Sequence, residues 1–251
     1  MKGPYGLEIT DSCAECTNLS RGFFCEFSDA VLQSLDRVSH KTILPAGAIL
    51  FVEGQATRGV YLVRSGRVKL SIASAEGKKL IVRIARAGDL LGIRGALTGH
   101  AYEATAETLA PCRIDFVTRT NLLALLDQHH SLARTLAIAA SNELSEYIDH
   151  ARVLYLSDSA GEKLARLLLR LIEEFGESTD NGICFQTMLT HEEIAQMIGA
   201  SRETVTRELS ALKRKQIVRG SNGRLLIPNR AALAALAHRG GESEVSRASR
   251  P

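Results

Sequence analysis

The sequence predicts an α+β protein in which a strand-rich N-terminal half precedes one long helix and a helical C-terminal domain. Short apolar runs punctuated by glycines fill residues 31–118, and this pattern is typical of an antiparallel sandwich or barrel. Apolar residues at spacings of four and three follow over residues 122–156, which favours a long helix. Two shorter helical patterns, separated by a glycine, occupy residues 189–216.

Local signals are strongest in residues 189–216. Thr190 and Glu193 form a capping-box pair at the start of the first helix, and Gly199 can adopt the left-handed conformation that ends it. Ser201 caps the second helix. The apolar positions that we expect to be buried are Ile194, Met197 and Ile198 in the first helix and Val205, Leu209 and Leu212 in the second. Two such helices around a tight turn predict a helix-turn-helix, whose second helix lies in the major groove of DNA.

The exposed face of the second helix has the chemistry of a base-reading surface. Arginine can donate two hydrogen bonds to guanine, and glutamate can accept one from cytosine N4. Glu203 and Arg207 are i,i+4 neighbours and share this face. The alternative is an amphipathic surface helix with an ordinary ion pair, but the cap, the turn, the apolar stripe and the basic residues 213–215 agree on DNA binding. We therefore predict DNA contacts from Thr190, Ser201, Arg202, Glu203, Thr204, Thr206 and Arg207.

The run Ser201-Arg202-Glu203-Thr204-Val205-x-Arg207 resembles the recognition-helix signature of the Crp/Fnr superfamily of bacterial transcription regulators. The resemblance extends from about Cys13 to about Leu236. It implies a cyclic-nucleotide-binding-like β-roll (a jelly roll), a dimerisation helix and a C-terminal winged helix-turn-helix. It also implies that a homodimer binds a palindromic double-stranded operator and contacts RNA polymerase.

We accordingly expect five segments along the chain. They are a cysteine-bearing N-terminal arm at 1–30, a β-roll sensor domain at 31–118, a dimerisation helix region at 119–156, a winged-helix DNA-binding domain at 157–236 and a disordered tail at 237–251. Asn222-Gly223 is the hairpin turn signal expected in the wing. The first helix of the winged domain has a predicted core face of Leu164, Leu167, Leu168 and Leu171.

The long helix carries an apolar seam suited to pairing with a second helix. Its members are Leu136, Ala140, Leu144, Tyr147, Ala151 and Leu154. Spacing alone leaves open that this helix packs on its own domain, and the family resemblance favours a dimer interface. Dimerisation would place two recognition helices one DNA turn apart, which is the spacing that reads a palindrome.

Charge and hydropathy are consistent with this interpretation. The net charge of the 251-residue chain is only +3, but residues 186–230 hold eight Lys/Arg against four Asp/Glu, an excess that suits phosphate neutralisation. Neither a signal-peptide pattern nor an apolar run of membrane-spanning length is present, so we expect a cytoplasmic protein. None of the common catalytic motifs is present either, and we predict that the chain is not an enzyme.

The cysteines provide a second functional signal. Cys13, Cys16 and Cys25 form a C-x2-C-x8-C cluster, Cys112 follows far along the chain, and Cys184 is expected in a core. Four thiolates complete either a tetrahedral zinc site or the ligand set of an iron–sulfur cluster. Their spacing does not choose between these two.

The family resemblance adds that FNR-type regulators have three cysteines in an N-terminal arm and a fourth in the β-roll. It implies that Cys13, Cys16, Cys25 and Cys112 bind a [4Fe–4S] cluster that senses oxygen, nitric oxide or redox state and controls dimerisation and DNA binding. The gap between Cys16 and Cys25 is longer than in the best-known FNR pattern. Structural zinc and a thiol switch are the alternatives.

A small-molecule effector in the β-roll is the other alternative. Gly88-Asp89-Leu90 resembles the start of a cyclic-nucleotide site, but residues 99–104 lack the Arg-Ser/Thr pair that clamps the phosphate. Glu103 would repel a phosphate there, and Arg94 is the only cation nearby in the sequence. The family resemblance also implies TGTGA-like half-sites rather than TTGAT, because the recognition helix combines Arg202 with Glu203 and Arg207.

Overall fold

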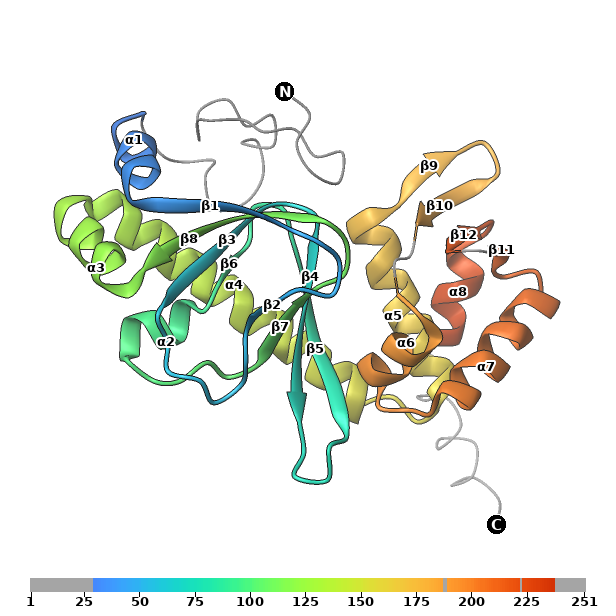
Figure 1. Ribbon diagram of the computed structural model, residues 1–251. Coiled ribbons are helices and arrows are strands. Elements are labelled where there is room, and N and C mark those ends of the chain that lie inside the picture. Colours follow the sequence, from blue (N-terminus) through green and yellow to red (C-terminus); the bar gives the residue numbers. More distant parts are fainter. Residues whose placement is uncertain (1–28, 187–188, 222, 238–251) are drawn as a thin grey trace, which may run out of the picture. The chain divides into compact units, whose positions relative to one another are not determined.

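The structure, a computed structural model, describes residues 29–186, 189–221 and 223–237 (Figure 1). Cys13, Cys16, Cys25 and the predicted C-terminal tail from residue 238 lie outside the described residues. The chain forms two compact units, Met1–Tyr147 and Ile148–Pro251. The boundary between them falls within the long helix, and each unit is described by itself.

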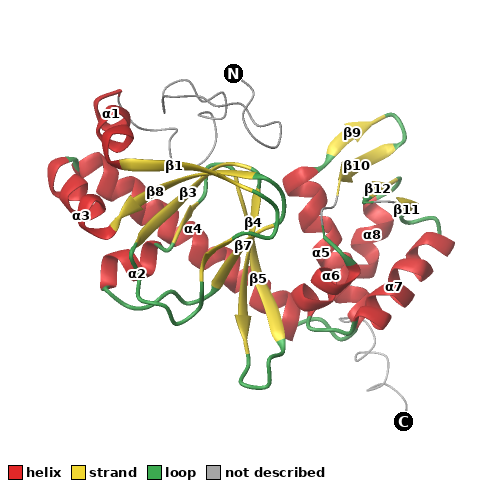
Figure 2. Cartoon of the chain, viewed as in Figure 1, coloured by secondary structure: helices red, strands yellow, loops and turns green. Residues whose placement is uncertain are grey.

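The first unit is built on two four-stranded antiparallel sheets, as the glycine-punctuated apolar runs predict (Figure 2). One sheet has the order β1-β8-β3-β6 and comprises Ser39–Leu44, Cys112–Thr118, Gly59–Ser65 and Leu90–Leu91. The other has the order β2-β7-β4-β5 and comprises Ile49–Phe51, Thr105–Thr108, Arg67–Ala73 and Lys79–Arg86. The predicted α+β fold with an N-terminal β-domain is therefore confirmed.

Two apolar clusters hold this unit together. In the first, Phe51 stacks on Tyr102 with ring centroids 4.0 Å apart. The Tyr102 hydroxyl donates a hydrogen bond to Gly59 O at 2.8 Å, so its polar end is satisfied inside the core. The second cluster lies among α1 (Asp29–Val38), α2 (Ile93–Thr98) and the helices that follow the β-domain.

The predicted single helix over 122–156 is two helices, α3 (Arg119–Gln128) and α4 (His130–Tyr155). They are separated by His129, whose backbone is extended with φ −129° and ψ 92°. This break lets Leu122 and Leu125 of α3 share one core cluster with Leu132 and Leu136 of α4. Periodicity could not reveal the break, because neither glycine nor proline marks it.

The second unit has the predicted helix-turn-helix and wing. Ser159 caps α5 (Ala160–Phe175), whose predicted core leucines are all buried. The wing strands β11 (Arg219–Ser221) and β12 (Arg224–Ile227) pair antiparallel, and Gly223 has φ +79° in the turn between them. They extend a sheet with β10 (Gly182–Gln186) and β9 (Glu177–Thr179), and α8 (Arg230–Ala237) follows. Within the described ranges, no helix is long and apolar enough to cross a membrane.

Candidate functional site

The helix-turn-helix consists of α6 (His191–Ile198) and α7 (Arg202–Arg214), and its caps are those that the sequence predicts. Thr190 Oγ1 accepts from Glu193 N at 3.2 Å, and Glu193 Oε2 accepts from Thr190 N at 2.9 Å. Gly199 adopts the left-handed conformation, with φ 64° and ψ 36°. Ser201 Oγ accepts from Thr204 N at 3.2 Å. These contacts satisfy backbone groups at the helix ends and fix where each helix begins.

Burial of one side of α7 determines which side chains remain available to a ligand. Val205, Leu209 and Leu212 are at most 6% exposed, whereas Arg202, Glu203, Thr206 and Arg207 are exposed. Arg207 has an ion pair with Glu208 at 3.5 Å, yet its side chain is 70% exposed. A pair this exposed contributes little to stability, so the guanidinium can exchange Glu208 for an external partner.

Glu203 lies in the first turn of α7. Hydrogen bonds from its own backbone N–H and from the Ser201 hydroxyl hold the pKa of Glu203 below its ordinary value. The carboxylate is therefore ionised near neutral pH and can act only as a hydrogen-bond acceptor. This is the protonation state needed to accept from cytosine N4.

One contact between the two helices involves His191, which no sequence pattern marks as functional. His191, at the start of α6, has Nδ1 2.9 Å from Thr206 Oγ1 on α7. The Thr206 hydroxyl also lies 2.9 Å from Arg202 O, to which it donates. The two side chains are 15 residues apart, and no helical or strand spacing rule links residues at that distance.

The exposed face of α4 differs from the predicted dimer seam. Leu136 is 2% exposed within the core of the first unit, and the Tyr147 hydroxyl donates to Glu143 Oε1 at 3.3 Å. Leu144 and Ala151 are exposed as expected, while Ala140 and Leu154 are half-buried. A continuous exposed stripe at spacings of four and three is formed by Ala137, Ser141, Leu144, Ile148, Ala151 and Tyr155. Leu136 and Tyr147 therefore do not fit a seam on this face.

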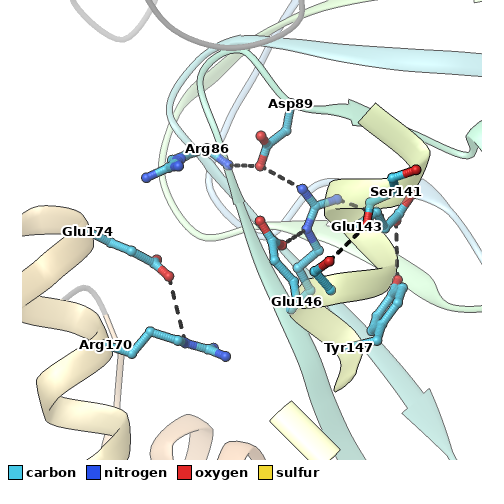
Figure 3. Close-up of polar contacts among 10 residues, drawn as sticks. Arg86, Asp89, Ser141, Glu143, Glu146, Tyr147, Arg170 and Glu174 are labelled. Atoms are coloured by element: carbon cyan, nitrogen blue, oxygen red, sulfur yellow. Dashed lines mark hydrogen bonds and ion pairs between the residues drawn. The ribbon is translucent and has the colours of Figure 1, made fainter. Parts of the chain in front are cut away.

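A buried ionic network links β5 to α4 within the first unit. Arg83 pairs with Asp89 at 3.1 Å, with Glu143 at 3.3 Å and with Glu146. Figure 3 shows Asp89, Glu143, Glu146 and Tyr147 converging on this site. Burial raises the pKa of Asp89 and of Glu143 above the ordinary carboxyl value, with the Arg83 charge acting against it. Burial disfavours the Arg83 cation, but the surrounding carboxylates outweigh it and raise the pKa of Arg83.

The region where a cyclic phosphate would be clamped is occupied by the protein's own contacts. Arg94 Nη1 lies 2.9 Å from Glu103 Oε2, and Tyr102 is committed to the core. The nearby cation is thus already paired with a carboxylate. An anionic ligand would have to displace Glu103 to reach it.

Cys112 is the one proposed metal ligand among the described residues. It begins β8, is 0% exposed, and has Sγ 3.3 Å from Arg67 O and 3.2 Å from Ala110 O. Burial raises the pKa of the Cys112 thiol, so it is protonated here. The sulfur fits in chemistry as a cluster or zinc donor, but as a thiolate it would have to turn away from both carbonyls.

Two further observations concern Cys184 and possible metal ligands elsewhere in the described residues. Cys184 lies in β10 and is 9% exposed, as expected for a core residue. Across the part of the chain that the structure describes, no three His, Cys, Asp or Glu side chains are placed to hold a metal ion. A site that uses Cys112 with three or more protein ligands must therefore draw at least one of them from outside the described residues.

Comparison with known proteins identifies both halves of the chain. Residues 41–129 match the cyclic nucleotide-binding domain, and residues 162–236 match the Crp-like helix-turn-helix domain. The chain is 26% identical over 229 residues to the fumarate and nitrate reduction regulatory protein of Salmonella typhi, covering 90% of each. It is 25% identical over 213 residues to the CRP-like cAMP-activated global transcriptional regulator of Mycobacterium tuberculosis strain H37Rv, covering 85% of this chain and 95% of that protein.

Solved structures show the same architecture. FixK2 from Bradyrhizobium japonicum aligns with a TM-score of 0.70 at 23% identity, over 79% of this chain and 97% of that one. At this identity the likeness concerns the fold alone.

The buried network predicts that Arg83→Met lowers the free energy of unfolding of the first unit by about 3–5 kcal/mol at pH 7.5, because three carboxylates lose their shared cation. The deficit should shrink toward pH 5. Without the Arg83 charge, which lowers the pKa of Asp89 and of Glu143, these carboxyls bind protons more readily in the native state of the variant than in that of the wild type. Acidification therefore stabilises the variant relative to the wild type. Urea unfolding at both pH values measures this. The matched control Arg94→Met removes an arginine that is 57% exposed and should cost less than about 1 kcal/mol. Equal losses for the two variants would contradict the prediction.

Proposed function

Because the chain belongs to the Crp/Fnr family of DNA-binding transcription regulators, we propose that it binds a palindromic operator as a homodimer and that a [4Fe–4S] cluster controls this binding. The observation that carries the proposal is the exposed face of α7, where Arg202, Glu203 and Arg207 project beside a buried apolar stripe. A regulator of this kind acts in the cytoplasm, where the DNA lies, and passes its signal to RNA polymerase.

Base recognition follows from the donors and acceptors of that face. Arg202 and Arg207 offer bidentate donors to guanine, and the ionised Glu203 accepts from cytosine. Thr190, Ser201 and Thr204 lie at the helix starts, where backbone N–H groups favour phosphate oxygens. The combination of Arg202 with Glu203 and Arg207 supports TGTGA-like half-sites.

Dimerisation is proposed through the exposed stripe of α4 rather than through the seam expected from the sequence. Leu144, Ile148 and Tyr155 are 59%, 46% and 85% exposed, and apolar side chains at heptad spacing gain stability by packing against a second helix. Leu144 and Ala151 belong both to this stripe and to the seam predicted from spacing. The stripe omits the four other residues of the predicted seam, which are buried or half-buried.

Control by a cluster is proposed from the cysteine pattern. Cys13, Cys16, Cys25 and Cys112 supply the four thiolates that a [4Fe–4S] cluster requires, and the cluster would supply a group that reacts with oxygen or nitric oxide. The bound arm would favour the paired state of α4, and its release would shift the population toward monomers that leave DNA. Structural zinc or a thiol switch on the same cysteines is the second candidate, because their spacing suits both.

An effector in the β-roll is supported by the cyclic nucleotide-binding domain match and by a relative described as cAMP-activated. The lack of an Arg-Ser/Thr pair at residues 99–104 argues against an anionic effector in this chain. We therefore prefer the cysteines, rather than an effector site in the β-roll, as the sensor.

Replacing Leu144 by Glu should shift the protein from dimer to monomer and weaken operator binding, because two buried carboxylates would face each other across the seam. Sedimentation at a concentration where the wild type is dimeric measures the shift. Asn142→Glu adds the same charge to an exposed position of α4 outside the stripe and should leave the dimer intact. A dimeric Leu144→Glu protein would refute this seam.

Replacing Arg202 by Val should relax a guanine preference at one base pair by roughly 1–3 kcal/mol. Binding-site selection followed by affinity measurement on single-base variants tests it. Arg214→Ala, at the exposed end of the same helix, should instead weaken all sequences about equally and reduce the salt dependence. An unchanged preference at every position in Arg202→Val would remove Arg202 from the base contacts.

Anaerobically purified protein should contain about four irons and four sulfides per chain, with a visible absorption band that bleaches in air. Cys112→Ser should lose the band and the iron while remaining folded, and Cys184→Ser should keep both. An intact cluster in Cys112→Ser would exclude that residue as a ligand. Stoichiometric zinc in the wild type would replace the cluster with a structural metal.

A further inference from the structure

We propose that Thr206 recognises the C5-methyl group of a thymine in each half-site, and that His191 is the positioning residue that commits Thr206 to this role. The inference rests on DNA binding through α7 and deepens it by assigning one specificity determinant. Thr206 lies on the exposed face of α7 with Arg202, Glu203 and Arg207, one helical turn from two of them, so it faces the same groove.

The one proton that the Thr206 hydroxyl can donate is used inside the protein. A hydroxyl has one proton to donate, and the structure gives Thr206 Oγ1 two partners, Arg202 O and His191 Nδ1, each at 2.9 Å. When the proton goes to Arg202 O, His191 Nδ1 must carry hydrogen and donate to the hydroxyl. When the Thr206 hydroxyl donates its proton to His191 Nδ1, it cannot donate to any other acceptor.

Either arrangement leaves the hydroxyl without a proton for DNA. Guanine O6 and N7, adenine N7 and thymine O4 are all acceptors in the major groove, so Thr206 cannot recognise them by donating. Its methyl group is unaffected by these bonds. The apolar group that the major groove offers to a threonine methyl is the C5-methyl of thymine.

His191 makes this assignment depend on both helices. It belongs to the first turn of α6, whereas Thr206 lies in the middle of α7, and both side chains are exposed. Their contact ties the rotamer of the base-reading residue to the neighbouring helix. Without the imidazole, this contact no longer fixes the Thr206 rotamer. The hydroxyl can then turn toward the groove and offer its proton or a lone pair to a base, so selectivity at that base pair should broaden.

The test uses the full-length protein and its selected operator. Each thymine of the half-site is replaced in turn by deoxyuridine, which lacks only the methyl group, and Kd is measured. At one position the wild type should lose about fourfold in affinity per half-site, the size expected for one methyl group taken out of water. Thr206→Ser, which keeps the hydroxyl and removes the methyl, should show no loss on uracil at that position, while Thr206→Val should retain it.

His191→Ala should reduce the uracil effect and admit other bases at that position, with the preferences at the remaining positions unchanged. Ser210→Ala is the matched control, because Ser210 Oγ donates to Thr206 O one turn further along the same exposed helix, and it should behave as the wild type. The inference is overturned if no thymine shows the uracil effect, if the selected half-site contains no thymine, or if Thr206→Ser keeps the effect. These outcomes differ from failure of the proposed function, in which the wild type would show no selective operator binding and no dependence on Arg202.

Discussion

The interface that this protein offers to DNA depends on one constraint, the burial of a single side of α7. Val205 is 0% exposed, and Leu209 and Leu212 are nearly so. Because a helix turns 3.6 residues at a time, burying these three positions leaves Arg202, Glu203, Thr206 and Arg207 exposed on the other side. Apolar packing thus fixes the orientation of the polar residues, and the polar residues contribute little to folding.

The Gly199 turn makes that burial possible. Its left-handed backbone at φ 64° reverses the chain between α6 and α7, a conformation that residues with a Cβ adopt only at a cost. The two caps then decide which residues occupy the first turns. With Thr190 and Ser201 as caps, His191 and Arg202 each become the first residue of a helix, and this register brings His191 within reach of Thr206.

The sequence predicts interactions between residues that are close along the chain, and it does not predict those between residues that are far apart along it. The capping box, the glycine turn, the apolar stripes and the wing turn involve residues a few positions apart, and each was predicted. The sequence does not predict the break at His129, because neither glycine nor proline marks it and the leucines that it brings into one core lie on two different helices. The seam that spacing predicts on α4 includes Leu136, which the core of the first unit buries. Spacing identifies apolar positions on a helix, but it does not say which of them are buried in the protein's own core and which remain exposed.

The polar contacts that were missed are also the long-range ones. Arg83 and Glu143 are 60 residues apart in sequence, and no local pattern marks Arg83 as buried, since its strand reads as a mixed run of basic and apolar residues. In the sequence, Asp89 lies in a segment that resembles the start of a cyclic-nucleotide site, and Glu103 would repel a phosphate there. The structure places these two carboxylates in ion pairs with Arg83 and Arg94.

The surroundings of the Cys112 sulfur determine what metal binding at this residue would do to the β-domain. Its sulfur lies where Gly66, at φ +90°, has no side chain, since a Cβ there would come within 2.4 Å of Sγ. Cys112 also begins β8, which pairs with both β1 and β3. To bind a metal, this sulfur would have to lose its proton and leave both carbonyl oxygens, which would disturb the first residue of a strand in the interior of that sheet. If Cys112 binds a metal, the effect of ligation would therefore enter the β-domain through β8 and the strands paired with it.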